Sequence, residues 1–356
     1  MQLNKIKKIA DTLINYSTKI KKGDYVQIIS DVNAEPLILE IYKQTIKKGA
    51  YPKIHLSLPK QSKIYYENAS EEQLKKFPEI SMYELKNTKK VIYISSPSDT
   101  RELEKINPKK ISIRQKTLEP YTKYRVEKTN WVIFDYPSKA LAKEANMPLN
   151  TYEKFVFNSV NLDWEKFSKS LLRIKKALDK TKEVKIISKD TNITLNIENR
   201  KAVIGNGSCN MPDGEIFTAP VETKTQGYIT FTYPAIYSGR LVSGIYLEFK
   251  NGKIVRAKAK ENEKFLQTMV NTDKGSHYLG ELGIGCNYKI NKFTKNILFD
   301  EKIGGSIHLA IGSAYSECKG KNKSAVHWDI IKDLKKDKGK MYFDNKLVQK
   351  EGKFLI

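Results

Sequence analysis

The spacing of apolar residues changes along the chain, and this change constrains the fold more than any other feature. In the first half, segments with helical spacing alternate with short apolar runs such as Tyr25–Ile29 and Trp131–Phe134. In the second half, short segments such as 307–311 repeat with a period of two and are separated by Gly and Asn. We therefore predict an α/β domain with a mostly parallel sheet over residues 1–182, followed by a β-rich domain, a barrel or a sandwich, over residues 183–356.

Local signals in the first half predict where some helices begin. Asn33 stands before Pro36, an arrangement typical of a capped helix start. Ser70 and Gln73 have the spacing of a capping box. A further helix is expected near Arg101–Ile106.

Length and composition indicate a globular protein with more than one core. The chain has 356 residues, of which 40% are hydrophobic and 29% are charged, and single cores rarely exceed about 250–300 residues. No apolar run approaches the roughly 20 residues that span a bilayer, and the N-terminal segment has no apolar stretch typical of a signal peptide. Three cysteines do not make a disulfide framework, so we expect a reduced, cytoplasmic protein.

The formal net charge of +24 raises the question of a nucleic-acid partner. The basic residues are mostly lysines, scattered over polar helix faces and turns rather than gathered in one block. Sequence-reading proteins usually rely on arginine. The pattern therefore favours a solvated lysine-rich surface over a polyanion-binding one.

Nucleotide binding is also disfavoured. A dinucleotide-binding α/β domain carries a glycine-rich turn after its first strand, but here that position has the sequence SDVNAEP. The chain also lacks the G-x-x-x-x-G-K-[ST] motif of a phosphate-binding loop.

Histidine is scarce, so the surroundings of each one are informative. Only four occur, and His327 and Asp329 form a His-x-Asp pair that a strand would place on one face. An imidazole and a carboxylate are common ligands of Zn²⁺. His308 interrupts an apolar strand-like segment. Alone, the pair is a common pattern, and a hydrogen-bonded core histidine stays open for His308.

Two glutamates occupy equally unusual positions. Glu281 lies in the small, apolar segment LGELGIG, and Glu215 follows a Pro-Asp-Gly turn. A charge in such surroundings is costly unless it is paired or coordinated. Each glutamate alone could belong to a turn or a salt bridge. Together with the histidines and Asp329, they form a donor set suited to two hydrolytic metal ions that share a bridging carboxylate.

Four segments carry a resemblance to a known family. NMPDGEIFTAPVE, LGELGIG, NILFDEKIGGSIHLAIGSAY and NKSAVHWD together resemble the M29 family of metalloaminopeptidases, of the thermophilic aminopeptidase T type. GDYVQIISDVNAEPLILEIYKQTIKKGA and WVIFDYPS in the first half are similar too, so the resemblance covers nearly the whole chain. It implies an N-terminal α/β domain, a C-terminal barrel-like domain that carries the site, and a homodimer.

The resemblance also implies the roles of individual residues. It makes five residues the metal ligands: Glu215, Glu281, His308, His327 and Asp329. Glu281 is the candidate for the carboxylate that bridges both ions. Tyr315 matches the family's site tyrosine, whose hydroxyl would ligate a metal or donate to the oxyanion.

The function implied is hydrolysis of the N-terminal residue from peptides, through two metal ions and an activated bridging water. Zn²⁺, Co²⁺ and Mn²⁺ all suit the ligand set, and the sequence does not choose among them. It also leaves open which of Glu222, Arg240 and Glu317 binds the substrate amine or carries a proton. The alternative is a catalytically inactive relative that binds peptides or metal.

Overall fold

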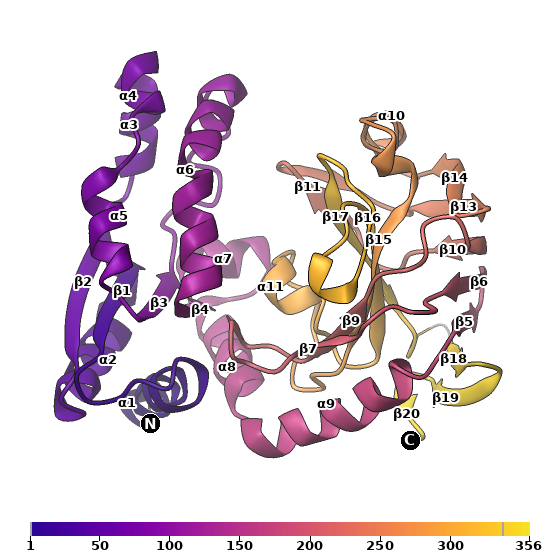
Figure 1. Cartoon of the computed structure of the whole chain (residues 1–356), viewed down its shortest axis with the longest axis horizontal. Helices are drawn as coiled ribbons and strands as arrows, with labels where there is room; N and C mark the ends of the chain where they lie inside the picture. Colours follow the sequence, from indigo (N-terminus) through magenta and orange to yellow (C-terminus); the bar gives the residue numbers. More distant parts are fainter. Residues whose placement is uncertain (1, 337) are drawn as a thin grey trace. The chain divides into compact units, whose positions relative to one another are not determined.

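The computed structural model describes residues 2–336 and 338–356, which divide into two compact units (Figure 1). The first unit runs up to Asn161 and also takes in Gly207–Pro212. The second unit comprises Leu162–Asn206 and Asp213–Ile356. The domain boundary near residue 182 stays a prediction.

The first unit is built on a parallel sheet, which confirms the predicted α/β class. Its strand order is β2-β1-β3-β4-β8, and every pair is parallel. Ile28 on β1 lies opposite Ile54 on β2 and Ile92 on β3, so apolar side chains run across the sheet. The strands are β1 (Tyr25–Asp31), β2 (Tyr51–Ser57), β3 (Lys90–Ser95), β4 (Asn130–Asp135) and β8 (Asn210–Met211).

The helices of the first unit test the predicted helix starts. Ser70 and Gln73 form the predicted capping box of α4. The cap predicted at Asn33 is wrong: the residue before α2 is Ala34, and the Asn33 amide donates to the Ser96 carbonyl and the Ser98 hydroxyl instead. The helical elements are α1 (Gln2–Asp11), η1 (Thr12–Ser17), η2 (Val32–Ala34), α2 (Glu35–Lys47), α3 (Gln61–Asn68), α4 (Glu71–Lys75), α5 (Glu79–Lys86), α6 (Pro108–Lys128), α7 (Lys139–Glu144) and α8 (Leu149–Val160).

The helix predicted near Arg101–Ile106 is also wrong. That segment forms turns, and the helix α6 begins at Pro108. Its start is capped by Asn107, whose side chain accepts from the Lys109 amide. None of the residues of α6 is buried, so the helix has no apolar stripe by which its sequence could reveal it.

The second unit contains two large antiparallel sheets, which confirms its β-rich class. The strand orders have free ends in the part of the chain that the structure describes, so neither sheet closes into a barrel. The larger sheet runs β14 (Lys253–Lys258), β13 (Tyr246–Lys250), β10 (Gln226–Thr230), β6 (Thr191–Asn196), β5 (Glu183–Ser188), β18 (Lys340–Phe343), β19 (Lys346–Lys350) and β20 (Lys353–Phe354). The smaller sheet runs β17 (His327–Asp333), β16 (Ser306–Gly312), β15 (Leu279–Gly285), β9 (Glu215–Thr218) and β7 (Val203–Gly205).

Shorter elements complete this unit. Helix α9 packs along β7 and β9 (Figure 1). The remaining pieces are α9 (Trp164–Leu178), the hairpin of β11 (Ala235–Tyr237) and β12 (Arg240–Val242), α10 (Glu263–Val270), η3 (Gly275–His277), α11 (Ile297–Asp300) and η4 (Ser316–Cys318).

One hydrophobic core joins the two sheets of the second unit. Leu282, Leu309 and Ile330 of the smaller sheet belong to this core together with residues of the larger sheet. Because side chains alternate along a strand, the residues next to them point to the opposite face. The period-two pattern of the sequence therefore gives the smaller sheet an apolar face and a second face that is free to carry chemistry.

No helix in the described part of the chain is both long enough and apolar enough to cross a membrane.

Candidate metal centre

All five predicted ligands lie on neighbouring strands of the smaller sheet. Glu215 begins β9, Glu281 lies on β15, His308 on β16, and His327 and Asp329 on β17. Strand register brings them together: Ala310 lies opposite both Glu281 and Asp329 in the paired strands beside it. Leu282, Leu309 and Ile330 follow Glu281, His308 and Asp329 directly in the sequence and face the core. The ligands therefore share the other face of the sheet.

Glu281 occupies the centre of the arrangement. Its Oε1 lies 3.3 Å from Nε2 of His308, and its Oε2 lies 3.4 Å from Nε2 of His327. The two oxygens of one buried carboxylate therefore face two different imidazoles. This is the geometry expected of a carboxylate shared by two adjacent sites.

Two groups of side chains place their donor atoms close enough to hold a metal ion. One is Glu215, Glu301 and His308, and the other is Glu281, His327 and Asp329; within each group the donor atoms lie within 4.8 Å of one another. Glu301 was missed by sequence reasoning. The available signal was its position in NILFDEKIGGSIHLAIGSAY, seven residues before His308 and just after the apolar α11.

Backbone carbonyls fix the orientation of both histidines. Nδ1 of His308 lies 3.2 Å from the carbonyl of Glu301, and Nδ1 of His327 lies 2.8 Å from the carbonyl of Ser313. A carbonyl only accepts, so each Nδ1 carries the hydrogen and each Nε2 faces the carboxylates. Metal-ligating histidines are held in this way in known metal sites.

A β-bulge turns Glu281 toward the ligand face. The pairing of β15 with β16 shifts register between Leu279 and Glu281, and Leu279 and Leu282 both belong to the hydrophobic core. In a regular strand Leu279 and Glu281, two residues apart, would lie on the same face; the unpaired extra residue Gly280 places them on opposite faces instead. The bulge therefore lets an apolar anchor and a ligand stand two residues apart.

Gly283 makes room for the His308 ring. It lies directly opposite His308 across the β15–β16 pair, and a Cβ added at Gly283 would overlap the Cε1 and Nε2 atoms of the imidazole. The glycine thus lets the ring lie across the strand, with its Nε2 toward Glu281.

Mutual interactions strongly shift the protonation equilibria of the group in the absence of ions. Burial lowers the pKa of His308, but its hydrogen bond to Glu281 and the charges of Glu215, Glu281 and Asp329 raise it to about 10. Burial likewise lowers the pKa of His327, and Glu281 and Asp329 raise it to about 9. Burial raises the pKa of Glu281, but the two histidines lower it to about 2. The protonated imidazoles therefore supply positive charge that metal ions would otherwise supply.

Two carboxylate oxygens indicate that the group suits metal ions. Oε2 of Glu215 and Oδ1 of Asp329 are buried, and neither has a hydrogen-bond partner among the described residues. A buried acceptor without a partner is costly. One such atom belongs to each of the two groups, and imidazole nitrogens with carboxylate oxygens are ordinary ligands of Zn²⁺, Co²⁺ and Mn²⁺. The residues therefore fit two divalent ions.

Tyr315 lies beside the histidine end of the group. Its ring centroid is 5.0 Å from that of His327 and 5.7 Å from that of Phe217, and the residue is 45% exposed. Partial burial and the negative charges of the carboxylates raise the pKa of Tyr315. Its hydroxyl therefore stays protonated and can donate a hydrogen bond.

The three polar residues left open by the sequence lie in different surroundings. Glu222 is paired with Arg200, at 2.6 Å, and accepts a hydrogen bond from the Lys321 amide. The Arg240 guanidinium lies 5.1 Å from the centre of the Phe265 ring. Glu317 is exposed in η4, two residues after Tyr315. Glu222 is thus engaged in holding the Lys321 segment.

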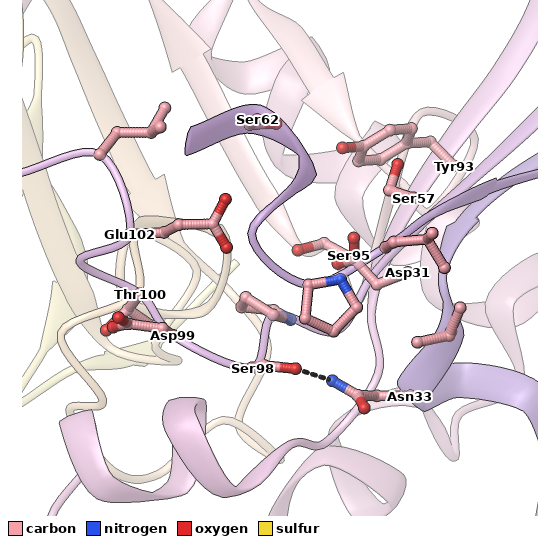
Figure 2. A pocket seen from close by; sticks show the side chains of 15 residues that line it. Asp31, Asn33, Ser57, Ser62, Tyr93, Ser95, Ser98, Asp99, Thr100 and Glu102 are labelled. Carbon is pink, nitrogen blue, oxygen red and sulfur yellow. Dashed lines mark hydrogen bonds between the residues drawn. The ribbon is translucent and has the colours of Figure 1, made fainter. Parts of the chain in front are cut away.

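The first unit has a polar cavity of its own, of about 440 Å³. It lies where β1, β2 and β3 end, and Figure 2 shows Asp31, Ser57 and Ser95 on one side of it and Glu102 on another. Its lining includes no Lys, Arg or His, which agrees with the missing phosphate-binding motifs. Asp31 accepts from the Ser96 amide, and Glu102 accepts from the Lys60 and Lys63 amides at the start of α3. These carboxylates therefore stabilise the surrounding loops.

Comparison with protein families decides the identity of the chain. The model of the thermophilic metalloproteases, family M29, matches residues 2–354. The chain belongs to this family. The resemblance inferred from four sequence segments is thereby confirmed over nearly the full length.

Individual relatives support this membership. Aminopeptidase AmpS of Bacillus subtilis (strain 168) is 28% identical over 92% of this chain and 89% of its own. Aminopeptidase T of Thermus aquaticus is 32% identical over 34% of this chain and 33% of its own.

Two solved structures share the fold. AmpT from Thermus thermophilus aligns with a TM-score of 0.86 over 99% of both chains, at 21% identity. A 2,5-dihydroxypyridine dioxygenase from Pseudomonas putida KT2440 aligns with a TM-score of 0.66 over 100% of this chain and 98% of its own, at 14% identity.

The requirement for a residue without a side chain at position 283 can be tested by adding a methyl group. Gly283→Ala should weaken ion binding by about 10- to 100-fold, as loss of a supporting contact does in other metal sites, because the His308 ring must move. Calorimetric titration of the ion-free protein with Zn²⁺ measures this. Gly239→Ala is the control, since a Cβ there meets no atom within 4 Å, and its positive φ of 77° gives it a backbone cost that Gly283→Ala does not have. Equal ion affinity in the Gly283 variant would contradict the argument.

Ion binding should release protons. His308 and His327, with pKa values of about 10 and 9, are both protonated at pH 7 without ions, and each must lose its proton to act as a ligand. We expect release of about two protons from the imidazoles and one from Glu215, whose pKa burial raises to about 8, and an affinity that rises as pH rises toward 9–10. Titrations in buffers of different ionisation enthalpy count the protons.

Two variants make this count specific. His327→Gln should release about one proton fewer, whereas His55→Gln, in the first unit, should release as many as the unaltered protein. An affinity independent of pH would show that the imidazoles are neutral before the ions bind.

Proposed function

We propose that the chain removes the N-terminal residue from peptides by hydrolysis at a centre of two divalent metal ions. The observation that carries the proposal is the position of Glu281, whose two carboxylate oxygens face His308 and His327 separately. That geometry suits two adjacent ions with a shared carboxylate ligand.

The predicted class of enzyme, a metal-dependent aminopeptidase, is confirmed at the level of the family and its relatives. The family is described as a metalloprotease, and the relatives compared above are named aminopeptidases. The roles of single residues, the identity of the metal and the assembly state are our proposals.

We assign the ligands according to the two groups of donor atoms. Glu215, Glu301 and His308 would hold one ion, His327 and Asp329 would hold the other, and Glu281 would offer one oxygen to each. Glu301 is an addition to the set implied by the resemblance. Zn²⁺, Co²⁺ and Mn²⁺ all suit these donors, and metal analysis of the purified protein would identify the physiological one.

The surrounding side chains define what happens to the substrate. When bound, the ions supply Lewis-acid polarisation of the carbonyl and lower the pKa of water. The Tyr315 hydroxyl donates a hydrogen bond to the oxyanion that develops on the carbonyl oxygen. Glu301 and Asp329 are the more exposed carboxylates of the group, with side chains 17% and 13% exposed. They are the carboxylate ligands nearest to solvent, so the free α-amino group of the substrate would bind beside them, which favours cleavage at the free N-terminus.

Assembly and location are part of the same proposal. The resemblance supports a homodimer, for which sedimentation analysis is the direct measurement. Cys286 and Cys318 are both thiols without a disulfide bond, which supports a reducing, cytoplasmic location.

The activity can be tested with short unblocked peptides and ion-free protein. Added Zn²⁺, Co²⁺ or Mn²⁺ should restore release of free amino acids, and N-acetylated peptides should not be cleaved. Glu281→Gln should lose activity by roughly 1000-fold or more, because the stabilisation supplied by the ions depends on their shared ligand. Glu248→Gln, on β13 of the larger sheet, is the matched control. Stoichiometric ion binding without any release would support a catalytically inactive relative instead.

Tyr315 can be tested by removing its hydroxyl. Tyr315→Phe should lower kcat by roughly 100-fold, because one donor to the oxyanion is lost, while KM and ion content change little. Steady-state kinetics and metal analysis measure both. Tyr228→Phe, an exposed position on β10, should leave kcat unchanged. A Tyr315 variant that loses its ions would show a ligand role for the hydroxyl instead.

A further inference from the structure

A buried lysine lies against one of the two ligand groups. Lys302 follows Glu301 in the chain, and its side chain is fully buried. Its Nζ donates a hydrogen bond to the Glu301 carboxylate and lies 3.6 Å from Oε1 of Glu215. A buried ammonium group is very costly unless it is paired. Both of its carboxylate partners belong to the same group, Glu215, Glu301 and His308.

The other group has no such partner. Among the described residues, Glu281 and Asp329 form ion pairs with histidines, and no lysine or arginine pairs with either. A histidine ring nitrogen can itself serve as an ion ligand, whereas the lysine ammonium group has only donors and brings a positive charge to its two carboxylates. The two groups therefore differ in fixed charge although their donor sets are similar.

The geometry lets the ammonium group and an ion be present together. Oε1 of Glu215 faces Lys302, while Oε2 lies 3.5 Å from Nε2 of His308 and has no hydrogen-bond partner. One oxygen is thus held by the lysine and the other is free for an ion. The lysine nevertheless repels a divalent cation at this short range, and it already neutralises the carboxylates when the ion is absent.

We propose that Lys302 makes the two ion sites unequal. The site of Glu281, His327 and Asp329 retains its ion tightly, and the site of Glu215, Glu301 and His308 exchanges its ion readily. Lys302 is a positioning residue that acts as the counter-ion of Glu215 and Glu301 whenever that ion leaves. This inference rests on the proposed function only in treating both groups as ion sites.

The test is a calorimetric titration of the ion-free full chain with Co²⁺. The unaltered protein should bind two ions in two steps, the second at least about tenfold weaker than the first. Lys302→Met should tighten the weak step by about tenfold or more and leave the tight step nearly unchanged. Lys302→Arg keeps the charge and should retain the gap between the steps. Glu215→Gln should remove the weak step.

Lys332 supplies the matched control. It is also fully buried, but its Nζ donates to the Thr230 carbonyl at 2.9 Å. Lys332→Met removes a buried ammonium group outside the ligand groups and should leave both affinities unchanged. If Lys302→Met does not fold without ions, its holo form is challenged with a chelator instead, and the second ion should leave more slowly than from the unaltered protein.

Three outcomes would overturn the inference: equal steps in the unaltered protein, a weak step that Lys302→Met leaves unchanged or weakens, or the same change in Lys332→Met. The titration needs no turnover, so it is separate from the test of function. Two unequal steps without peptide hydrolysis would refute the aminopeptidase proposal and leave this inference standing.

Discussion

The contact on which the site depends is the buried carboxylate of Glu281 between two imidazoles. Three neighbouring strands must keep their register for it to form, because His308 and His327 come from β16 and β17 and Glu281 from β15. The bulge after Leu279 turns the carboxylate to the correct face, and Gly283 leaves room for one of the rings. The hydrophobic core on the opposite face holds the sheet rigid. The same strands therefore carry core residues on one face and ligands on the other.

Charge balance is the second constraint. Four carboxylates, Glu215, Glu281, Glu301 and Asp329, gather where water is largely excluded, which is unfavourable without cations. In the absence of ions, the two protonated imidazoles and Lys302 supply three positive charges. Two of these charges leave as protons when ions bind, and the third stays. The same charge inventory thus stabilises the ion-free fold and sets how each ion competes for its site.

The sequence predicted the fold class, and its resemblance to the family pointed to five candidate ligands that the structure brings onto neighbouring strands of one sheet. Period-two spacing predicted the strands of the second unit, and charged residues in apolar segments stood out because burying them is costly. Glu301 was not predicted as a ligand because it lies in a turn, where an acidic residue is common. Helix α6 was not predicted because it buries no side chain and has no apolar stripe. A barrel-like second unit was predicted, but the sheets have free ends in the described part of the chain. Strand order depends on long-range pairing, which local sequence patterns do not encode.

The fold alone does not decide the chemistry. A dioxygenase shares the architecture over the whole of this chain with a TM-score of 0.66, at only 14% identity, so sheets of this kind support proteins of different activity. What indicates the chemistry of this chain is the donor set on one face of the smaller sheet. Glu281 offers one oxygen to each of two groups, and the carbonyls of Glu301 and Ser313 point both imidazoles toward it. That arrangement is the basis on which we propose hydrolysis through two ions, and the unequal charge around the two groups is the basis on which we propose that one ion is held more firmly.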